Sequence, residues 1–161
     1  MIVVLDASTL INLDNGEVLA EVLSLPGKTF QISPEVLRES RTVAKAIKAA
    51  VERGDIGWVD DNAIDAEEYE DALAVWELGP GETECILAAR VLGCTVACDD
   101  GAARKVIENE LGVSRMTGTV GLLREAVLAR LLTADEAFKA YQQMKSLGGF
   151  LPKLSLVDFT P

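Results

Sequence analysis

The sequence predicts a three-layer α/β/α sandwich with a short, mostly parallel central sheet. Short apolar runs rich in β-branched residues, such as 2–5 and 95–98, alternate with longer segments of helical pattern. Strands that alternate with helices are typical of a parallel sheet covered on both faces. No linker, repeat or low-complexity tract interrupts the 161 residues, and 49% of them are hydrophobic. We therefore expect a single domain over residues 1–161.

The order of the predicted elements follows from the same patterns. The predicted strands are 2–5, 30–32, 56–59, 95–98 and 113–116. The predicted helices are 8–13, 17–23, 34–53, 62–76, 82–92, 102–111, 119–131 and one that begins after 133. The apolar tail 150–159 is expected to pack back on the sheet.

Local signals mark the ends of the predicted helices in the first half. Ser8 is expected to cap the first helix, which Asp14-Asn15-Gly16 breaks. Ser33 and Pro34 supply the N-cap and the first-turn proline of a helix that should continue to Gly54.

Glycines and one capping box mark the helices of the second half. Gly79-Pro80-Gly81 opens a helix that Gly93 ends as a left-handed residue. Gly112 ends the helix after it, and Thr133 with Glu136 forms a capping box for the last one.

The residue types present limit the chemistry that the chain can perform. It contains no histidine, which excludes histidine-based triads and histidine-ligated zinc. Cys85, Cys94 and Cys98 are odd in number and lie in apolar stretches, so they are expected to be reduced core residues. No apolar run approaches a membrane span and the N-terminal run lacks a signal-peptide pattern, so we expect a cytoplasmic location with no membrane partner.

The net charge of −11 argues against a nucleic-acid partner until its distribution is considered. Eight acidic residues and no basic residue lie between Asp60 and Glu77, so the rest of the chain carries only −3. The excess is therefore a property of one predicted helix, which is expected to be a solvated face.

Four acidic residues lie where strands end or helices begin. Asp6 and Asp99 directly follow strands, and Glu82 and Glu39 lie early in helices. Right-handed βαβ units place strand carboxyl ends and helix N-termini at one edge of the sheet. Two carboxylates about 4 Å apart repel by a few kcal/mol at an effective dielectric of ~20, and a divalent cation removes that cost. Oxygen ligands of this kind suit Mg²⁺ or Mn²⁺.

Each acid also has a purely structural interpretation. Asp6 could cap the helix after it, and Glu82 could simply complement a helix dipole. Glu84 competes with Glu82 for the crevice, although two residues of helix turn the side chain through roughly 200°. Of Asp99 and Asp100, either could cap the next helix and leave the other to the site. The candidate metal ligands are Asp6, Glu82, Asp99 and Asp100.

Four motifs in this order resemble those of the PIN-domain family. They are Asp6-Ala7-Ser8-Thr9-Leu10-Ile11, Ser33-Pro34-Glu35-Val36-Leu37-Arg38-Glu39, Gly81-Glu82-Thr83-Glu84, and Asp99-Asp100 followed by Ala103-Arg104. The third motif is similar to a Gly-Glu variant, and residues 117–123 are similar to the segment that follows it in a prokaryotic subgroup. The resemblance covers essentially the whole chain.

The resemblance implies a PIN-like sandwich and a Mg²⁺- or Mn²⁺-dependent single-strand ribonuclease, often the toxin of a VapC-like toxin–antitoxin pair. The catalytic residues that it implies are Asp6, Glu39, Glu82 and Asp99. It also implies polar support from Ser8, Thr117 and Thr119. Many toxins of the family carry Asp where this chain has Glu82, so the sequence departs from them at the third motif.

Basic residues suggest a path for single-stranded RNA. Spacings of three, seven and ten residues would place four of them on one face of the helix over 34–53. The proposed backbone contacts are Arg38, Arg41, Lys45, Lys48 and, near Asp99, Arg104. Trp58 and Trp76 are expected to pack in the core or under the acidic helix, which leaves no aromatic stacking surface. The apolar faces of 9–24 and 34–53 could form a homodimer face or an antitoxin groove, although core packing explains them equally well.

Two other classes of function remain open. The chain could be a catalytically silent PIN-like binding module. It could also be an Asp-dependent phosphate-transfer protein, but such phosphatases require Asp two residues after Asp6, where Ser8 stands.

Overall fold

The structure, a computed structural model, describes residues 1–161 apart from the side chain of Asp61. Within this part lies a five-stranded sheet in the order β3-β2-β1-β4-β5, with parallel pairing throughout. The strands are β1 (Ile2–Leu5), β2 (Thr29–Ile32), β3 (Ile56–Trp58), β4 (Thr95–Ala97) and β5 (Met116–Thr117). The predicted α/β/α sandwich is confirmed.

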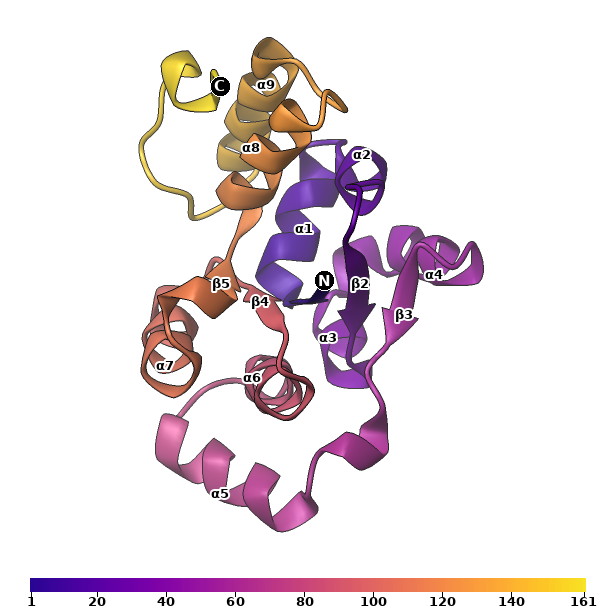
Figure 1. The fold of residues 1–161 in the computed structure, drawn as a ribbon, viewed down its shortest axis with the longest axis vertical. Coiled ribbons are helices and arrows are strands. Elements are labelled where there is room, and N and C mark those ends of the chain that lie inside the picture. The colour runs from indigo at the N-terminus through magenta and orange to yellow at the C-terminus, as the bar shows by residue number, and fades with distance from the viewer.

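Helices cover both faces of this sheet. They are α1 (Ala7–Asn15), α2 (Leu19–Leu23), α3 (Pro34–Glu39), α4 (Ala44–Glu52), α5 (Ala66–Trp76), α6 (Pro80–Leu92), α7 (Gly101–Leu111), α8 (Thr119–Leu128) and α9 (Ala134–Ser146). Short 3₁₀ turns are η1 (Arg41–Val43), η2 (Asp61–Ala63), η3 (Val113–Arg115) and η4 (Leu156–Phe159). Figure 1 shows α1, α2, α8 and α9 on one side of the sheet and α5, α6 and α7 on the other.

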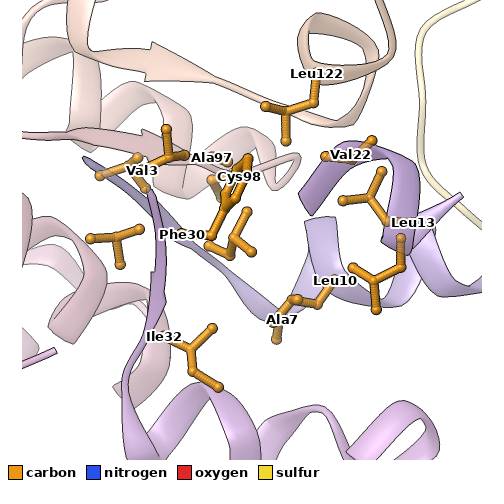
Figure 2. Packing of buried hydrophobic residues seen from close by; sticks show 14 of the residues in the cluster. Val3, Ala7, Leu10, Leu13, Val22, Phe30, Ile32, Ala97, Cys98 and Leu122 are labelled. Carbon is orange, nitrogen blue, oxygen red and sulfur yellow. The ribbon is translucent and has the colours of Figure 1, made fainter. Parts of the chain in front are cut away.

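The core forms where the central strands meet these helices. Val3 of β1 and Phe30 of β2 are 0% and 1% exposed, because a parallel strand in the middle of a sheet is covered on both faces. Figure 2 shows Leu10 and Leu13 of α1 and Leu122 of α8 in the same buried cluster, and all three are fully buried. Burial of each such side chain contributes about 1.5–3 kcal/mol relative to exposure, which anchors α1 and α8 against the sheet edge that carries the site.

The chain reverses its direction of growth across the sheet between β1 and β4. β1 pairs with β2 on one side, and the chain continues to β3 before it crosses to β4 on the other side. In open α/β sheets ligands bind outside the carboxyl ends of the strands at such a reversal. Asp6 and Asp99 follow the two strands that flank it, and the Asp6 N–H donates to the Ala97 carbonyl at 3.0 Å.

The prediction of one helix from 34 to 53 is wrong. α3 ends at Glu39, and Ser40 (φ −87°, ψ 38°) interrupts the helix before η1 and α4. The Ser40 N–H closes the last turn of α3 on Val36, while its carbonyl accepts from Val43 in a tighter turn. The break allows Val43 and Ile47 to reach the core, where both are buried. The basic residues of this segment therefore do not lie on one continuous helical face.

Several helix ends also differ from expectation. Asp6, and not Ser8, caps α1. The acidic helix begins at Ala66 after an Asp65 cap, later than the expected residue 62, because η2 precedes it. α8 ends at Leu128, and β5 starts only after the 3₁₀ turn over 113–115.

The C-terminal tail packs on α9 rather than on the sheet. Phe159 is 2% exposed, and its ring lies 6.0 Å from that of Phe138 and 5.6 Å from that of Tyr141. Phe150, at the start of the tail, is 92% exposed. The core position expected for Trp58 is also wrong, since its side chain lies at the end of β3 and is 46% exposed.

The three cysteines are free and buried, as expected. In the described part of the chain, no helix combines the length and the hydropathy needed to cross a membrane.

Candidate active site

Asp6 is buried at the junction of β1 and α1. Its Oδ2 accepts hydrogen bonds from the Ser8 N–H at 3.2 Å, the Ser8 hydroxyl at 2.5 Å and the Cys98 thiol at 3.3 Å. Asp6 is only 2% exposed. A buried carboxylate is costly unless donors satisfy it, and here three donors do so.

Asp99 follows β4 and is held between α1 and α8. Its Oδ1 accepts from the Thr119 N–H at 2.9 Å, and its Oδ2 accepts from Asn12 Nδ2 at 2.9 Å and from the Thr119 hydroxyl. Thr9 Oγ1 lies 3.5 Å from the same Oδ2. A β-carbon on Gly118 would lie 2.6 Å from Oδ1, so this close approach requires glycine.

Ser8 connects the two aspartates. Its hydroxyl donates to Asp6 and accepts from the Asp99 N–H at 3.0 Å. One side chain therefore sets the spacing between the ends of β1 and β4.

Glu82 and Glu39 meet at the N-terminus of α6. Glu82 Oε2 accepts from the Gly79 N–H at 2.9 Å, and Glu39 Oε1 accepts from the Gly81 N–H at 3.0 Å. Both carboxylates lie 3.5 Å from the position that a β-carbon would take on Gly79. A β-carbon on Gly81 would lie 2.9 Å from Glu39 Cδ, so glycine makes room for this side chain. The positive end of the helix dipole favours both carboxylates here.

The surroundings of Glu82 show that these acids share one electrostatic environment. Burial raises the pKa of Glu82 above its ordinary value of 4.5, against the hydrogen bond from Gly79. The charges of Asp6, Asp100 and Glu39 raise this pKa further. Glu82 thus lies within electrostatic reach of Asp6, Asp100 and Glu39, while Asp99 is linked to Asp6 through Ser8.

Asp99 and Asp100 have different contacts. Asp100 is exposed and caps α7, because its Oδ1 accepts from Ala102 N–H at 2.8 Å and Ala103 N–H at 2.9 Å. Asp99 instead turns toward α1 and α8. Asp100 still lies near enough to Glu82 to raise its pKa.

Thr117 and Arg104 differ from the roles expected of them. Thr117 meets its neighbours through its carbonyl oxygen, which accepts from the Cys98 N–H at 3.2 Å and from Arg104 Nη1 at 2.9 Å. Arg104 Nη1 also donates to the Cys98 carbonyl at 2.8 Å. The guanidinium therefore ties the ends of β4 and β5 together beside Asp99. Of the two expected threonines, Thr119 is the one that contacts that carboxylate.

The basic residues around α3 and α4 line two adjoining hollows. Arg38, Arg41 and Lys48 line one of about 360 Å³, and Lys45 and Lys48 line another of about 460 Å³. The interrupted helix thus leaves them on one surface, although Arg38 is paired with an acidic neighbour on α3.

Sequence reasoning missed Asn12, Thr9 and Cys98. Thr9 and Asn12 lie close to Ser8 on α1 and are 0% and 5% exposed, so they are buried polar residues beside the buried leucines of this helix. Polar residues at helical spacing after the first motif were the available signal. Nothing in its local sequence distinguishes Cys98 from a core residue.

The donor set suits a hard cation, although the carboxylates do not form a compact cluster. Among the described residues, no three Asp, Glu or Cys side chains converge as a metal-binding group. Mg²⁺ keeps several waters and takes only one or two carboxylates directly, and a hydrogen-bonded carboxylate retains free lone pairs. Asp6, Glu82 and Asp99 therefore fit such an ion in chemistry and in charge.

One comparison with known proteins agrees with this fold. The family model DUF3368, a PIN domain, matches residues 2–157. No curated protein and no solved structure matched the chain. PIN domains are generally nucleases. The parallel sheet, the acids at its reversal point and a match over nearly the whole length show that the chain belongs to the PIN-domain family.

Proposed function

We propose that the protein is a Mg²⁺- or Mn²⁺-dependent endonuclease that hydrolyses phosphodiester bonds in single-stranded RNA. The observation that supports this best is that Asp6 and Asp99, linked through Ser8, follow the two strands at the reversal point of the sheet, with Glu82 within electrostatic reach of Asp6 and Glu39. These carboxylates come from four separate segments, and the chain has no histidine to serve as a general base.

The residues of the site would have different roles in such a reaction. Asp6, Glu82 and Asp99 would hold the cation, which when bound would acidify a water and offset charge on the phosphate. Ser8 and Thr119 orient the two aspartates, so the oxygens need little rearrangement on binding. Burial and acidic neighbours raise the pKa of Glu82 in the metal-free chain, and a cation bound there would favour its ionised form.

The choice of single-stranded RNA rests on the family motifs and on the basic surface. Arg38, Arg41, Lys45 and Lys48 lie on the α3–α4 segment that carries Glu39. Cations on this surface would bind phosphates and offset the acidity of the chain, with an affinity that falls as salt rises.

The decisive experiment compares wild type with Asp6→Asn on a panel of labelled single-stranded RNAs in Mn²⁺. Asparagine also caps helices well, so α1 should stay intact while the charge is lost. We expect cleavage to fall roughly 100-fold or more, the effect of losing a few kcal/mol of transition-state stabilisation. Asp65→Asn is the matched control, because Asp65 is also the N-cap of a helix, α5, and is not one of the four acids of the site.

Two results would exclude this mechanism. One is equal cleavage by wild type and Asp6→Asn, and the other is cleavage that persists in a chelator. The melting temperatures of Asp6→Asn and Asp65→Asn are compared with that of the wild type. A loss of activity in Asp6→Asn without a lower melting temperature is chemical, and one with a lower melting temperature is structural.

A toxin role within a VapC-like pair is a further part of the proposal. It predicts that induced expression arrests growth and that Asp6→Asn relieves the arrest.

A binding module without turnover is the second candidate, since no three acidic or cysteine side chains converge among the described residues. Retained RNA binding without cleavage of any substrate in Mn²⁺ would support it. A homodimer or an antitoxin complex stays a prediction, and size measurements with and without a co-expressed partner would test it.

A further inference from the structure

Phe150 lies in the wall shared by two cavities on either side of Asp99. The smaller cavity, of about 300 Å³, is lined by Ser8, Asn12, Asp99 and Phe150 among others. The larger, of about 670 Å³, is lined by Asp99, Arg104 and Phe150 among others. Both volumes are in the range of ligand pockets. Phe150 is 92% exposed, which is unusual for a phenylalanine, a residue most often buried.

The backbone on both sides of Phe150 is anchored. Gly149 packs so closely that a β-carbon would lie 2.6 Å from Asn12 Oδ1 and 2.8 Å from the Met144 carbonyl. Its N–H donates to that carbonyl at 2.9 Å. On the other side Leu151 is 8% exposed, and the Pro152 carbonyl accepts from the Tyr141 hydroxyl at 2.5 Å. The backbone that carries the exposed ring is therefore anchored on both sides.

The larger cavity is also lined by two basic side chains, Arg104 and Arg124, and Asp99 is the one acid among its described lining residues. Asp158 lies outside this lining, with Oδ1 3.9 Å from Arg124 Nη2, and Arg104 Nη1 donates to the Cys98 and Thr117 carbonyls. Arg124 is oriented by the Asp158 carbonyl, which accepts from its Nε at 2.7 Å. Figure 1 shows the tail that follows α9 (yellow) passing beside α8, toward β5 and the site. An apolar ring, two guanidinium groups and a site carboxylate thus border one space.

We propose that Phe150 is a stacking platform that holds a base of the substrate strand beside Asp99, while Arg104 and Arg124 bind its phosphates. This rests on the proposed function and names the surface that receives the single strand. Base–aromatic stacking is tolerant of sequence and combines with basic side chains along the backbone in proteins that bind single strands. The two arginines favour a nucleic acid as the occupant, since guanidinium groups bind anionic phosphates. This proposal differs from the expectation that the chain has no aromatic stacking surface, because Phe150 is 92% exposed.

The test measures binding separately from cleavage. A fluorescent 12-nucleotide single-stranded RNA is titrated with the full chain in Ca²⁺, and anisotropy gives Kd. Phe150→Ala should raise Kd by about 5- to 150-fold, the range that stacking on one aromatic ring spans. Phe150→Trp should restore wild-type affinity, whereas Phe150→Leu, apolar but not aromatic, should not. Val157→Ala is the control, because Val157 is 71% exposed on the same tail and outside both cavities.

Three results would overturn the inference. The first is a Kd of Phe150→Ala or Phe150→Leu equal to that of the wild type. The second is failure of the wild type to bind the RNA at all. The third is a changed sedimentation coefficient for Phe150→Ala with unchanged Kd, which would indicate a protein interface. The proposed function fails separately. If the wild type cleaves the RNA and Phe150→Ala has an unchanged KM, the stacking surface is excluded and the proposed nuclease function is not. If RNA binding depends on Phe150 but no RNA is cleaved in Mn²⁺, the nuclease function is excluded and the stacking surface is not.

Discussion

The two aspartates of the site are positioned by their neighbours at least as much as by the strands that carry them. Asp6 and Asp99 accept hydrogen bonds from different sets of donors, and Ser8 belongs to both networks. A hydrogen bond to a charged group contributes about 1.5–3 kcal/mol, so each donor matters to stability as well as to the orientation of the carboxylate.

Replacing Thr119 tests this positioning. Thr119→Val keeps the shape of the side chain and removes the hydroxyl that donates to Asp99 Oδ2 at a site that is 0% exposed. We expect the free energy of unfolding to fall by about 1.5–3 kcal/mol, measured by urea denaturation in chelator. Thr117→Val is the matched control, because Thr117 meets its neighbours through its carbonyl oxygen. Equal stability of Thr119→Val and wild type would show that this hydroxyl does not hold Asp99.

The pKa of Glu82 gives a prediction about pH. Burial first, and then the charges of Asp6, Asp100 and Glu39, raise this pKa above 4.5 in the folded state. The folded protein therefore binds the proton more tightly than the unfolded chain does. The resulting stability is fully present below pH 4.5 and is lost as the pH rises through the raised folded pKa.

Glu82→Gln should remove this loss. Without metal, the variant should gain stability relative to wild type as the pH rises from 4.5 to 7, and thermal melts across that window measure the gain. Glu108→Gln, on the exposed face of α7, is the control and should change little. Mg²⁺ should narrow the difference, because the cation favours the ionised Glu82 of the wild type. A stability difference between Glu82→Gln and wild type that is the same at every pH would show that folding does not raise the pKa of Glu82.

Two helix ends do most to shape the other half of the site. The N-terminus of α6 gathers Glu82 and Glu39 on the backbone N–H groups of Gly79 and Gly81. The end of α3 delivers Glu39 to that point, since the helix stops there and Ser40 turns the chain away. In one helix continued to residue 53, the residues after Glu39 would extend along the axis of α3 instead of turning away at Ser40.

The break after α3 yields a pair of opposite predictions. Ser40 is fully buried, and among the described atoms its hydroxyl has no hydrogen-bond partner. Ser40→Ala should therefore raise the free energy of unfolding by about 1 kcal/mol. Ser33→Ala should lower it by about 1 kcal/mol, because the Ser33 hydroxyl accepts from the Val36 N–H as the cap of α3. Urea midpoints at constant slope measure both, and a loss of stability in Ser40→Ala would point to a partner such as a buried water.

Most of the acidic surplus of the molecule is concentrated in the segment from Asp60 to Glu77, which includes α5. α5 packs beside α6, as Figure 1 shows, and Glu68 on it pairs with Arg90 of α6. The start of α5 also lies near α3, since burial and, after it, charges that include that of Glu39 raise the pKa of Tyr69.

The position of the cysteines in this architecture predicts slow thiol chemistry. Burial raises the pKa of Cys85, Cys94 and Cys98, and the charge of Asp6 adds to the effect for Cys85 and Cys98. Native protein should react with a disulfide reagent only through opening, at least roughly 10³-fold slower than the unfolded chain. Absorbance of the released thiolate measures the rate, and all three thiols should react at once in denaturant. Fast labelling of Cys98 in the native state would contradict its contact with Asp6.

Strand positions, most helix starts and the order of the four acidic motifs could be predicted from the chain alone. Their signals are local: an apolar run, a cap, a glycine or a proline acts within a few residues of itself. The identity of Asp100 as the cap, the break at Ser40 and the support from Asn12 needed the folded molecule. Asn12 and Asp99 are 87 residues apart in sequence, and only packing decides that they meet. The same holds for Phe150, because whether an apolar residue in a tail is buried or exposed depends on what the rest of the chain leaves uncovered.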